Sequence, residues 1–310
     1  MIALVGLLWA DELDDAYAAL KEAQAANNAD DVLKWAPEVS KLGRAEAARA
    51  KPGDMTEANW KARVEYAKQV DVLAEYALST AAMQPNADPA KVVALVDALL
   101  ALNPKSQYVN QAAGVYITAL EKSGGAAKSL DGAAKVVNGN PTNEDALFAL
   151  MQGNYGKSND RAEQFAGRLI AVMRAKAKPD GVADADWTRK RNTMLGYAYY
   201  YAGVIPGTSA RPSYTDCDRN LRGGLPFIST QAGLAGTAYF YLGLCNYQIS
   251  KLTSDKGKLQ EALQFTEQGA GIAGPMQAQA QQNATVMRRE LGVAAAKPAA
   301  AKAKPAAKGK

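Results

Sequence analysis

The sequence contains no histidine and only two cysteines among its 310 residues. Histidine is the commonest general base near neutral pH and the commonest metal ligand, so its absence excludes catalytic triads and metal centres that depend on imidazole. Two thiols cannot supply the four ligands of an all-cysteine zinc site. We therefore expect a protein that is not an enzyme and that holds neither a cofactor nor a metal ion.

The sequence also lacks the signature of a β-sheet. It has only five phenylalanines, and no stretch alternates apolar and polar residues for long enough to form a half-buried strand. Alanine is abundant, and apolar residues recur at three- and four-residue spacing along most of the chain. The pattern predicts an all-α protein, and the length suits one large domain or two ordinary ones.

Excess positive charge is confined to the C-terminal end. The formal net charge is +5, from 36 basic and 31 acidic residues. Residues 292–310 contain no acidic residue and carry five lysines: Lys297, Lys302, Lys304, Lys308 and Lys310. A segment of alanine, lysine, proline and glycine buries too little apolar surface to offset its ordering entropy, so we predict a disordered tail. Its lysines suit nucleic acid, an anionic envelope polymer or lipid headgroups, and a solubilising role is the alternative.

Residues 1–10 (MIALVGLLWA) are apolar and uncharged. Ten residues are too few to cross a bilayer, but they suit the apolar region of a signal peptide, although no basic segment precedes them. We expect a signal-peptide remnant whose true start lies upstream of Met1, and a periplasmic or secreted protein. The alternative is an apolar helix leader packed on the first hairpin of a cytoplasmic protein. No transmembrane span is expected.

Three X-Pro steps divide the middle of the chain. Asn103-Pro104, Asn140-Pro141 and Lys178-Pro179 each follow one helical pattern and precede another, at spacings of 37 and 38 residues. Two helical patterns lie between successive steps, separated by Gly124-Gly125 in the first interval and by Gly156-Lys157-Ser158 in the second. Because proline cannot continue a helix, this arrangement predicts a series of antiparallel helical hairpins.

Two other motifs have ordinary structural interpretations. Gly156-Lys157-Ser158 matches the end of a phosphate-binding loop, but Met151 stands where that motif requires its first glycine. We interpret it as a turn of a helical hairpin. Acidic pairs such as Asp14-Asp15 and Asp184/Asp186 are expected at helix starts, where capping explains them without catalysis.

Two helical segments contain a Leu-Gly pair among aromatic residues: 194–203 (MLGYAYYYAG) and 239–247 (YFYLGLCNY). Together they resemble the first helix of a tetratricopeptide repeat, whose pattern reads W-x2-L-G-x2-Y. The resemblance extends over residues 11–291 and implies a right-handed solenoid of antiparallel helix hairpins with degenerate repeats. It implies that Gly196 and Gly243 mark close helix crossings. It places four larger residues in the core: Leu195, Tyr199, Tyr239 and Leu242.

The resemblance also implies a function, because tetratricopeptide proteins act as scaffolds that bind a protein or peptide in the groove lined by their first helices. Carried over, the groove residues are Lys190, Thr193, Tyr197, Tyr200, Thr237, Phe240, Leu244 and Tyr247. Tyr197 and Leu244 stand where a carboxylate clamp of the chaperone-binding type needs asparagine, so that activity is not expected. Eight of the fourteen tyrosines lie between 197 and 247. Packing between hairpins explains at least half of them, and an aromatic groove is the functional alternative.

The region between the two Leu-Gly segments is rich in proline and glycine, and residues 204–229 are predicted to be a loop with at most a short helix. Cys217 lies in this region and Cys245 in the second Leu-Gly segment. In an exported protein the two cysteines would form a disulfide that ties the loop to the repeats. In a cytoplasmic protein they would remain thiols.

The sequence thus predicts a non-enzymatic, tetratricopeptide-like scaffold of the cell envelope that binds a protein or peptide. The alternative is a binder of anionic polymers that acts through its basic tail. A third hypothesis, an all-helical enzyme that uses carboxylates or tyrosine, is disfavoured by the missing histidine.

Overall fold

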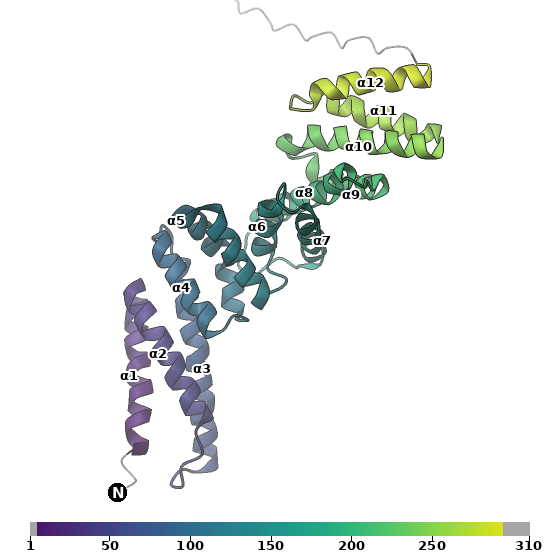
Figure 1. Cartoon of the computed structure of the whole chain (residues 1–310). Coiled ribbons are helices and arrows are strands. Elements are labelled where there is room, and N and C mark those ends of the chain that lie inside the picture. The colour runs from purple at the N-terminus through teal and green to yellow at the C-terminus, as the bar shows by residue number, and fades with distance from the viewer. Residues whose placement is uncertain (1–4, 294–310) are drawn as a thin grey trace, which may run out of the picture. The chain divides into compact units, whose positions relative to one another are not determined.

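The computed structural model describes residues 5–293, and for residues 5–11 and Ala232 only the backbone (Figure 1). Twelve α-helices and no strand occur in this range, which confirms the predicted all-α class. The chain divides into two compact units at Ala177 and Lys178. In the described part, no helix combines the length and apolar character needed to cross a membrane.

Unit 1 contains seven helices: α1 (Val5–Ala25), α2 (Ala29–Ala48), α3 (Glu57–Ala82), α4 (Pro89–Leu102), α5 (Gln107–Gly139), α6 (Glu144–Asn154) and α7 (Asn159–Ala175). Each packs on the next in the chain, and α1, α2 and α3 also contact α3, α4 and α5 respectively. One continuous core runs from α1 to α6, because these helices bury apolar residues at three- and four-residue spacing, and Phe165 of α7 packs against it. Fully buried members include Leu13, Leu78, Leu99 and Tyr116.

The two Asn-Pro steps form the same turn. Asn103 ends α4 and Ser106 caps α5, whereas Asn140 ends α5 and Asn143 caps α6. In each turn the backbone N–H of the capping residue donates to the carbonyl of the asparagine at 3.0 Å. The helix ends predicted at these two steps are therefore confirmed. The third step, Lys178-Pro179, lies where unit 1 gives way to unit 2.

Helix α5 is broken in the middle, as the Gly124-Gly125 pair predicts. Gly125 has φ 74° and ψ −177°, a conformation that glycine tolerates far better than other residues. A Cβ atom on Gly132 would lie 3.1 Å from the ring of Tyr116. The two halves of α5 therefore fold back on each other as a hairpin.

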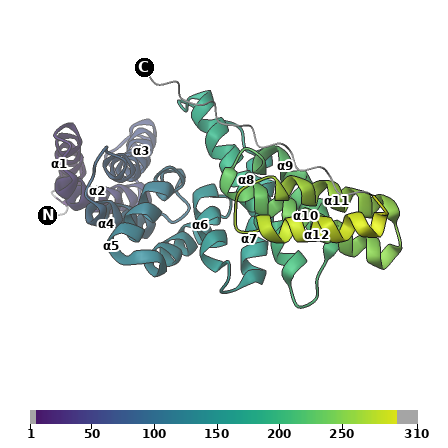
Figure 2. The same ribbon diagram turned by 90° about the horizontal axis from the view of Figure 1, so that it is seen from above.

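Unit 2 contains five helices: α8 (Asp184–Thr208), α9 (Tyr214–Ile228), α10 (Ala232–Thr253), α11 (Lys256–Ala270) and α12 (Gln277–Leu291). Again each packs on the next, and α10 also contacts α8 and α12 (Figure 2). Helices therefore pack in sequence order within each unit.

The loop predicted for residues 204–229 is wrong. Helix α8 continues through Pro206 to Thr208, and α9 is a regular helix of 15 residues. Pro206 cannot donate a hydrogen bond to the carbonyl of Ala202, and the side chain of Asn220 on α9 donates to that carbonyl instead, at 2.8 Å. Neighbouring helices thus compensate for the proline, which local sequence does not reveal.

The expected helix start at Asp14-Asp15 is also wrong. Both residues lie well inside α1, whose backbone begins at Val5 within the apolar segment 1–10. Asp184 and Asp186 do lie in the first turn of α8, where the helix dipole favours negative charge. Residues 1–4 and 294–310, including all five tail lysines, lie outside the described residues.

Candidate functional site

Three hollows lie among the helices of unit 1. A first hollow of about 580 Å³ lies where α1 and α3 end and α2 and α4 begin. A second, of about 340 Å³, lies between this corner and the first half of α5. A third, of about 410 Å³, lies between the two halves of α5 and α6. We call these three together the hollowed face.

The three hollows adjoin one another. Gln84 and Ala87 line both the first and the second, and Gly114 and Thr118 line both the second and the third. Alanine and glycine contribute to the lining of all three hollows, including Ala77, Ala81, Ala119, Ala126, Ala149 and Gly153. The three hollows are therefore neighbours along successive helices.

Two asparagines shape one rim of this face. Asn27, between α1 and α2, has φ 50°, and Asn86, between α3 and α4, has φ 60°. Asparagine is among the few residues other than glycine that adopt this left-handed conformation readily. Asn27 lines the first hollow and Asn86 the second, so two equivalent tight turns open the hollowed face at the same end of their hairpins.

A stripe of apolar side chains leads into the hollows. Of the nine large apolar side chains exposed in the described residues, three lie on α3, namely Val72, Leu73 and Tyr76, and a fourth, Met83, is the residue that ends this helix. Tyr76 lies four residues before Thr80 and Met83 lies three residues after it. At this spacing the three side chains lie on one side of the helix, and Thr80 lines the first hollow. Val115 of α5 is 40% exposed and lines the second hollow. Clustering of this kind, rather than single exposed residues, is typical of interaction sites.

Aromatic pairs join neighbouring helices beside this stripe. The rings of Tyr76 on α3 and Tyr108 on α5 meet edge to face with centroids 5.6 Å apart. Tyr17 on α1 and Tyr66 on α3 make a similar contact at 6.4 Å. Pairs in this geometry stabilise the helix contacts beyond simple burial. Tyr76 is nevertheless 43% exposed, so part of its ring remains open to a ligand.

Carboxylates outnumber cationic groups along the hollowed face. The ionisable residues that line it are Asp88, Lys91, Glu121, Lys122 and Asp145. Lys91 is also bound to Asp30, with 2.6 Å between Nζ and Oδ2, and this hydrogen bond raises the pKa of Lys91. Counting Asp30, four carboxylates accompany two ammonium groups, a net charge of −2.

The groove residues inferred from the tetratricopeptide resemblance lie elsewhere, in unit 2. Phe240 is buried, at 6% exposed, and the other seven are half-buried. On α8, the rings of Tyr197 and Tyr200 both contact the ring of Tyr201. On α10, the hydroxyl of Tyr247 donates a 2.8 Å hydrogen bond to Glu290 of α12. Thr237 lines a small hollow of unit 2, of about 260 Å³.

The two Leu-Gly helices pack closely at their glycines. A Cβ on Gly243 would lie 3.0 Å from the backbone nitrogen of Thr266 and 3.1 Å from the carbonyl oxygen of Ala262, both on α11. A Cβ on Gly196 would overlap the side chain of Gln231. Three of the four expected core residues are buried, and Tyr239 is half-buried with its ring stacked on Phe265 of α11.

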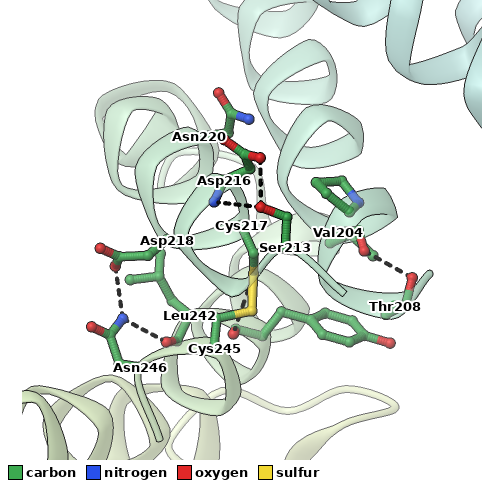
Figure 3. Close-up of a disulfide and its surroundings, with 12 residues drawn as sticks. Val204, Thr208, Ser213, Asp216, Cys217, Asp218, Asn220, Leu242, Cys245 and Asn246 are labelled. Carbon is green, nitrogen blue, oxygen red and sulfur yellow. Dashed lines mark hydrogen bonds between the residues drawn. A yellow bond between two sulfur atoms is a disulfide. The ribbon is translucent and has the colours of Figure 1, made fainter. Parts of the chain in front are cut away.

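Cys217 of α9 and Cys245 of α10 form a disulfide, and both residues are fully buried (Figure 3). A Cβ on Gly207 of α8 would lie 2.9 Å from the Cys217 sulfur and 3.1 Å from the Cys245 sulfur. The disulfide therefore holds α9 to α10, and α8 closes over it.

A polar network lies beside the disulfide. Fully buried Asn246 of α10 donates to Asp218 of α9 at 2.7 Å and accepts from Lys258 of α11 at 3.1 Å. Arg222 bridges Asp218 and Glu261, and the hydrogen bond from Lys258 lowers the pKa of Glu261. The network ties α9, α10 and α11 together. Its acidic and basic side chains balance, so it leaves no uncompensated charge for a ligand.

No family model matches the chain, and no curated protein matches it. In the described residues, no three cysteine, aspartate or glutamate side chains lie close enough together to hold a metal ion. The hollowed face of unit 1 is the candidate functional site.

Proposed function

We propose that this protein is a non-enzymatic, tetratricopeptide-like scaffold that binds a polypeptide segment along the hollowed face of unit 1. One observation carries the proposal: the three hollows adjoin one another, and the exposed apolar stripe of α3 lies beside them. A surface of this form offers room for successive side chains of a ligand, and exposed tyrosine and valine supply apolar contact area.

We further propose that the paired helices belong to a right-handed solenoid of degenerate repeats. Support comes from the identical Asn-Pro turns 37 residues apart and from the close contact of α10 and α11 at Gly243. Stacked hairpins bury one face of each helix and leave a second face open along the stack. The proposed binding surface is such a face.

Selection of peptides from a displayed random library on the full-length protein tests this function. Val115→Arg adds bulk and charge to the second hollow at a side chain that is 40% exposed. Val286→Arg on α12, at 38% exposed, is the matched control. Selected peptides should bind Val115→Arg at least tenfold more weakly than the control. Equal binding to both variants, or no selected peptide at all, would contradict the proposal.

The disulfide supports our proposal that the protein is exported, because disulfides persist in oxidising compartments and are rare in the cytosol. Fractionation of cells that express the natural gene, with trapping of free thiols before lysis, tests it. We expect an oxidised protein outside the cytoplasm. Two trapped thiols in a cytoplasmic protein would contradict the proposal.

Binding of anionic polymers is the second candidate, and the division of charge favours it. Residues 1–177 contain 22 acidic and 19 basic residues, a net charge of −3, whereas residues 178–310 contain 9 and 17, a net charge of +8. Without the five tail lysines, the net charge of residues 178–310 would be +3. Deletion of residues 292–310 separates the candidates, because polymer binding should disappear while peptide binding at the hollowed face should remain.

A further inference from the structure

We infer that the hollowed face binds its polypeptide ligand in an extended conformation, with the main chain of the ligand held by a row of glutamine and asparagine side chains. This inference rests on the proposed function, since it specifies the form of the ligand and the groups that recognise it. Three observations support it: the amide groups that line the hollows, the apolar side chains beneath them, and the charge of the face.

Primary amide side chains line each of the three hollows. Gln24, Asn27 and Gln84 line the first, Gln84 and Asn86 the second, and Gln152 the third. We call these five residues the amide row. Its three glutamines each lie within two residues of the end of a helix, namely α1, α3 and α6. The row therefore draws on three different hairpins of unit 1.

The side chains of the amide row make no hydrogen bond within the part of the chain that the structure describes. Other polar groups of the same hollows are engaged. Asn28 accepts from the backbone N–H groups of Asp30 and Asp31. The hydroxyls of Thr80 and Thr118 donate to carbonyls of their own helices. The amide row thus keeps its N–H donors and its carbonyl acceptors available to a ligand.

A primary amide matches the main chain of an extended polypeptide, because each offers N–H donors and a carbonyl acceptor. A helical ligand would satisfy its main-chain groups within itself. An extended ligand needs partners from outside, and no strand occurs in the described residues to supply them. The amide row can supply them instead, so it favours an extended ligand over a helical one.

Apolar side chains form the floor of the first hollow. Val32, Ala77 and Leu95 line it and are at most 1% exposed. Successive side chains of an extended segment point to opposite sides, so every second residue of the ligand would face this floor. The ligand should therefore carry apolar residues at alternate positions, with its main chain beside the amides.

The charge of the face selects among such segments. Four carboxylates and two ammonium groups line or adjoin the hollows, a net charge of −2. Acidic segments would be repelled. Three interaxial distances of about 8–10 Å separate α1 from α6, which corresponds to about nine extended residues at about 3.3 Å each. The ligand is thus a neutral or basic extended segment of another protein, about nine residues long.

The binding test uses linear 12-residue peptides selected on the full-length protein from a displayed random library. Gln24→Met and Gln84→Met each remove one amide and keep a side chain of similar length. Each should weaken binding about threefold to tenfold, the usual net effect of one hydrogen bond. Gln164→Met, at an exposed glutamine of α7 outside the hollows, is the matched control and should change affinity less than twofold. Equal affinity of the three variants in fluorescence anisotropy would overturn the inference.

Changes in the peptide identify the main-chain contacts. Replacing one peptide bond at a time by an ester removes an N–H group and leaves every side chain in place. At the position held by Gln84, the ester should weaken binding to wild type at least threefold and binding to Gln84→Met less than twofold, because the partner is already absent. A lactam bridge that holds the peptide in a helix should weaken binding at least tenfold. Tight binding of the bridged peptide, or the absence of any ester-sensitive position, would overturn the inference.

Failure of this inference is distinguishable from failure of the scaffold function. If selected peptides lose affinity in Val115→Arg but not in Gln24→Met or Gln84→Met, the scaffold function stands and main-chain recognition does not. If no peptide is selected, both fail, and binding to an oligosaccharide array would then show that the amides recognise sugar hydroxyls. Circular dichroism melting of each variant confirms that it folds.

Discussion

The hydroxyl of Tyr66 on α3 donates a 2.9 Å hydrogen bond to Asp14 on α1. The guanidinium of Arg63 pairs with the same carboxylate at 3.1 Å. These bonds explain why Asp14 lies inside a helix and not at its start, and they join the first helix of unit 1 to the third.

Tyr66→Phe should therefore lower the free energy of unfolding of unit 1 by about 1 kcal/mol, the usual net contribution of one hydrogen bond. Urea unfolding at neutral pH measures the change. Tyr17→Phe is the control, because its ring contacts Tyr66 but its hydroxyl makes no bond recorded in the described structure. A loss in the control as large as that in Tyr66→Phe would contradict this assignment.

Stability should also depend on pH through Tyr66. Burial and the hydrogen bond to Asp14 raise the pKa of Tyr66 to about 12, from an ordinary value near 10. The stabilisation is thus fully present below pH 10 and is lost as the pH rises toward 12. Wild type should lose more stability than Tyr66→Phe over this interval. Parallel pH profiles of the two proteins would contradict the prediction.

Gly243→Ala should destabilise unit 2 by about 1–3 kcal/mol, the range typical of overpacked cores. The added Cβ would press on the backbone of α11, which cannot move aside as a side chain tip can. Gly233→Ala on the same helix is the control, since nothing lies within 4 Å of its added Cβ. Thermal unfolding of both variants makes the comparison. A control as unstable as Gly243→Ala would mean that loss of glycine, not the close crossing, causes the effect.

Replacing Cys217 and Cys245 together by alanine should cost unit 2 about 3–4 kcal/mol, according to the chain-entropy model for their separation of 28 residues. Unit 1 contains neither cysteine, so its unfolding transition should not change and provides an internal reference. Denaturant unfolding with and without reductant measures the same effect in wild type. Two free thiols in the denatured, unreduced protein would show that the disulfide is not formed.

Asn143→Ala should destabilise unit 1 by about 2 kcal/mol, because it removes a helix cap and leaves the backbone N–H of buried Ala146 without its acceptor. The side chain of Asn143 accepts from Ala146 at 2.9 Å and donates to the side chain of Asn110 at 2.7 Å. Ser158→Ala is the control, since Ser158 precedes α7 without a side-chain cap bond. Chemical denaturation should place the control within about 0.5 kcal/mol of wild type.

Features fixed by local chemistry could be predicted from the sequence. Proline disfavours the helical conformation of the residue before it, and asparagine is a poor helix former, so the turns at Asn103 and Asn140 were identified correctly. The break at Gly125 was predictable for the same reason, because a pair of glycines weakens a helix locally. Apolar periodicity was enough to establish the all-α class.

Features that depend on tertiary contacts could not be predicted in this way. Helix α9 was missed because prolines and glycines suggested a loop, although Ser213, which caps the helix by accepting from Asp216, was a usable signal. The hollowed face was missed because it arises where small residues of separate helices meet, and no local motif marks them. The Leu-Gly motifs placed the predicted groove in unit 2 instead.

The contact between Gly207 and the two sulfur atoms has an evolutionary consequence. A side chain at position 207 and a disulfide between positions 217 and 245 compete for the same space, so the three positions cannot diverge independently. Descendants of this gene that keep both cysteines should keep glycine there, and lineages that have lost the pair should tolerate alanine or serine.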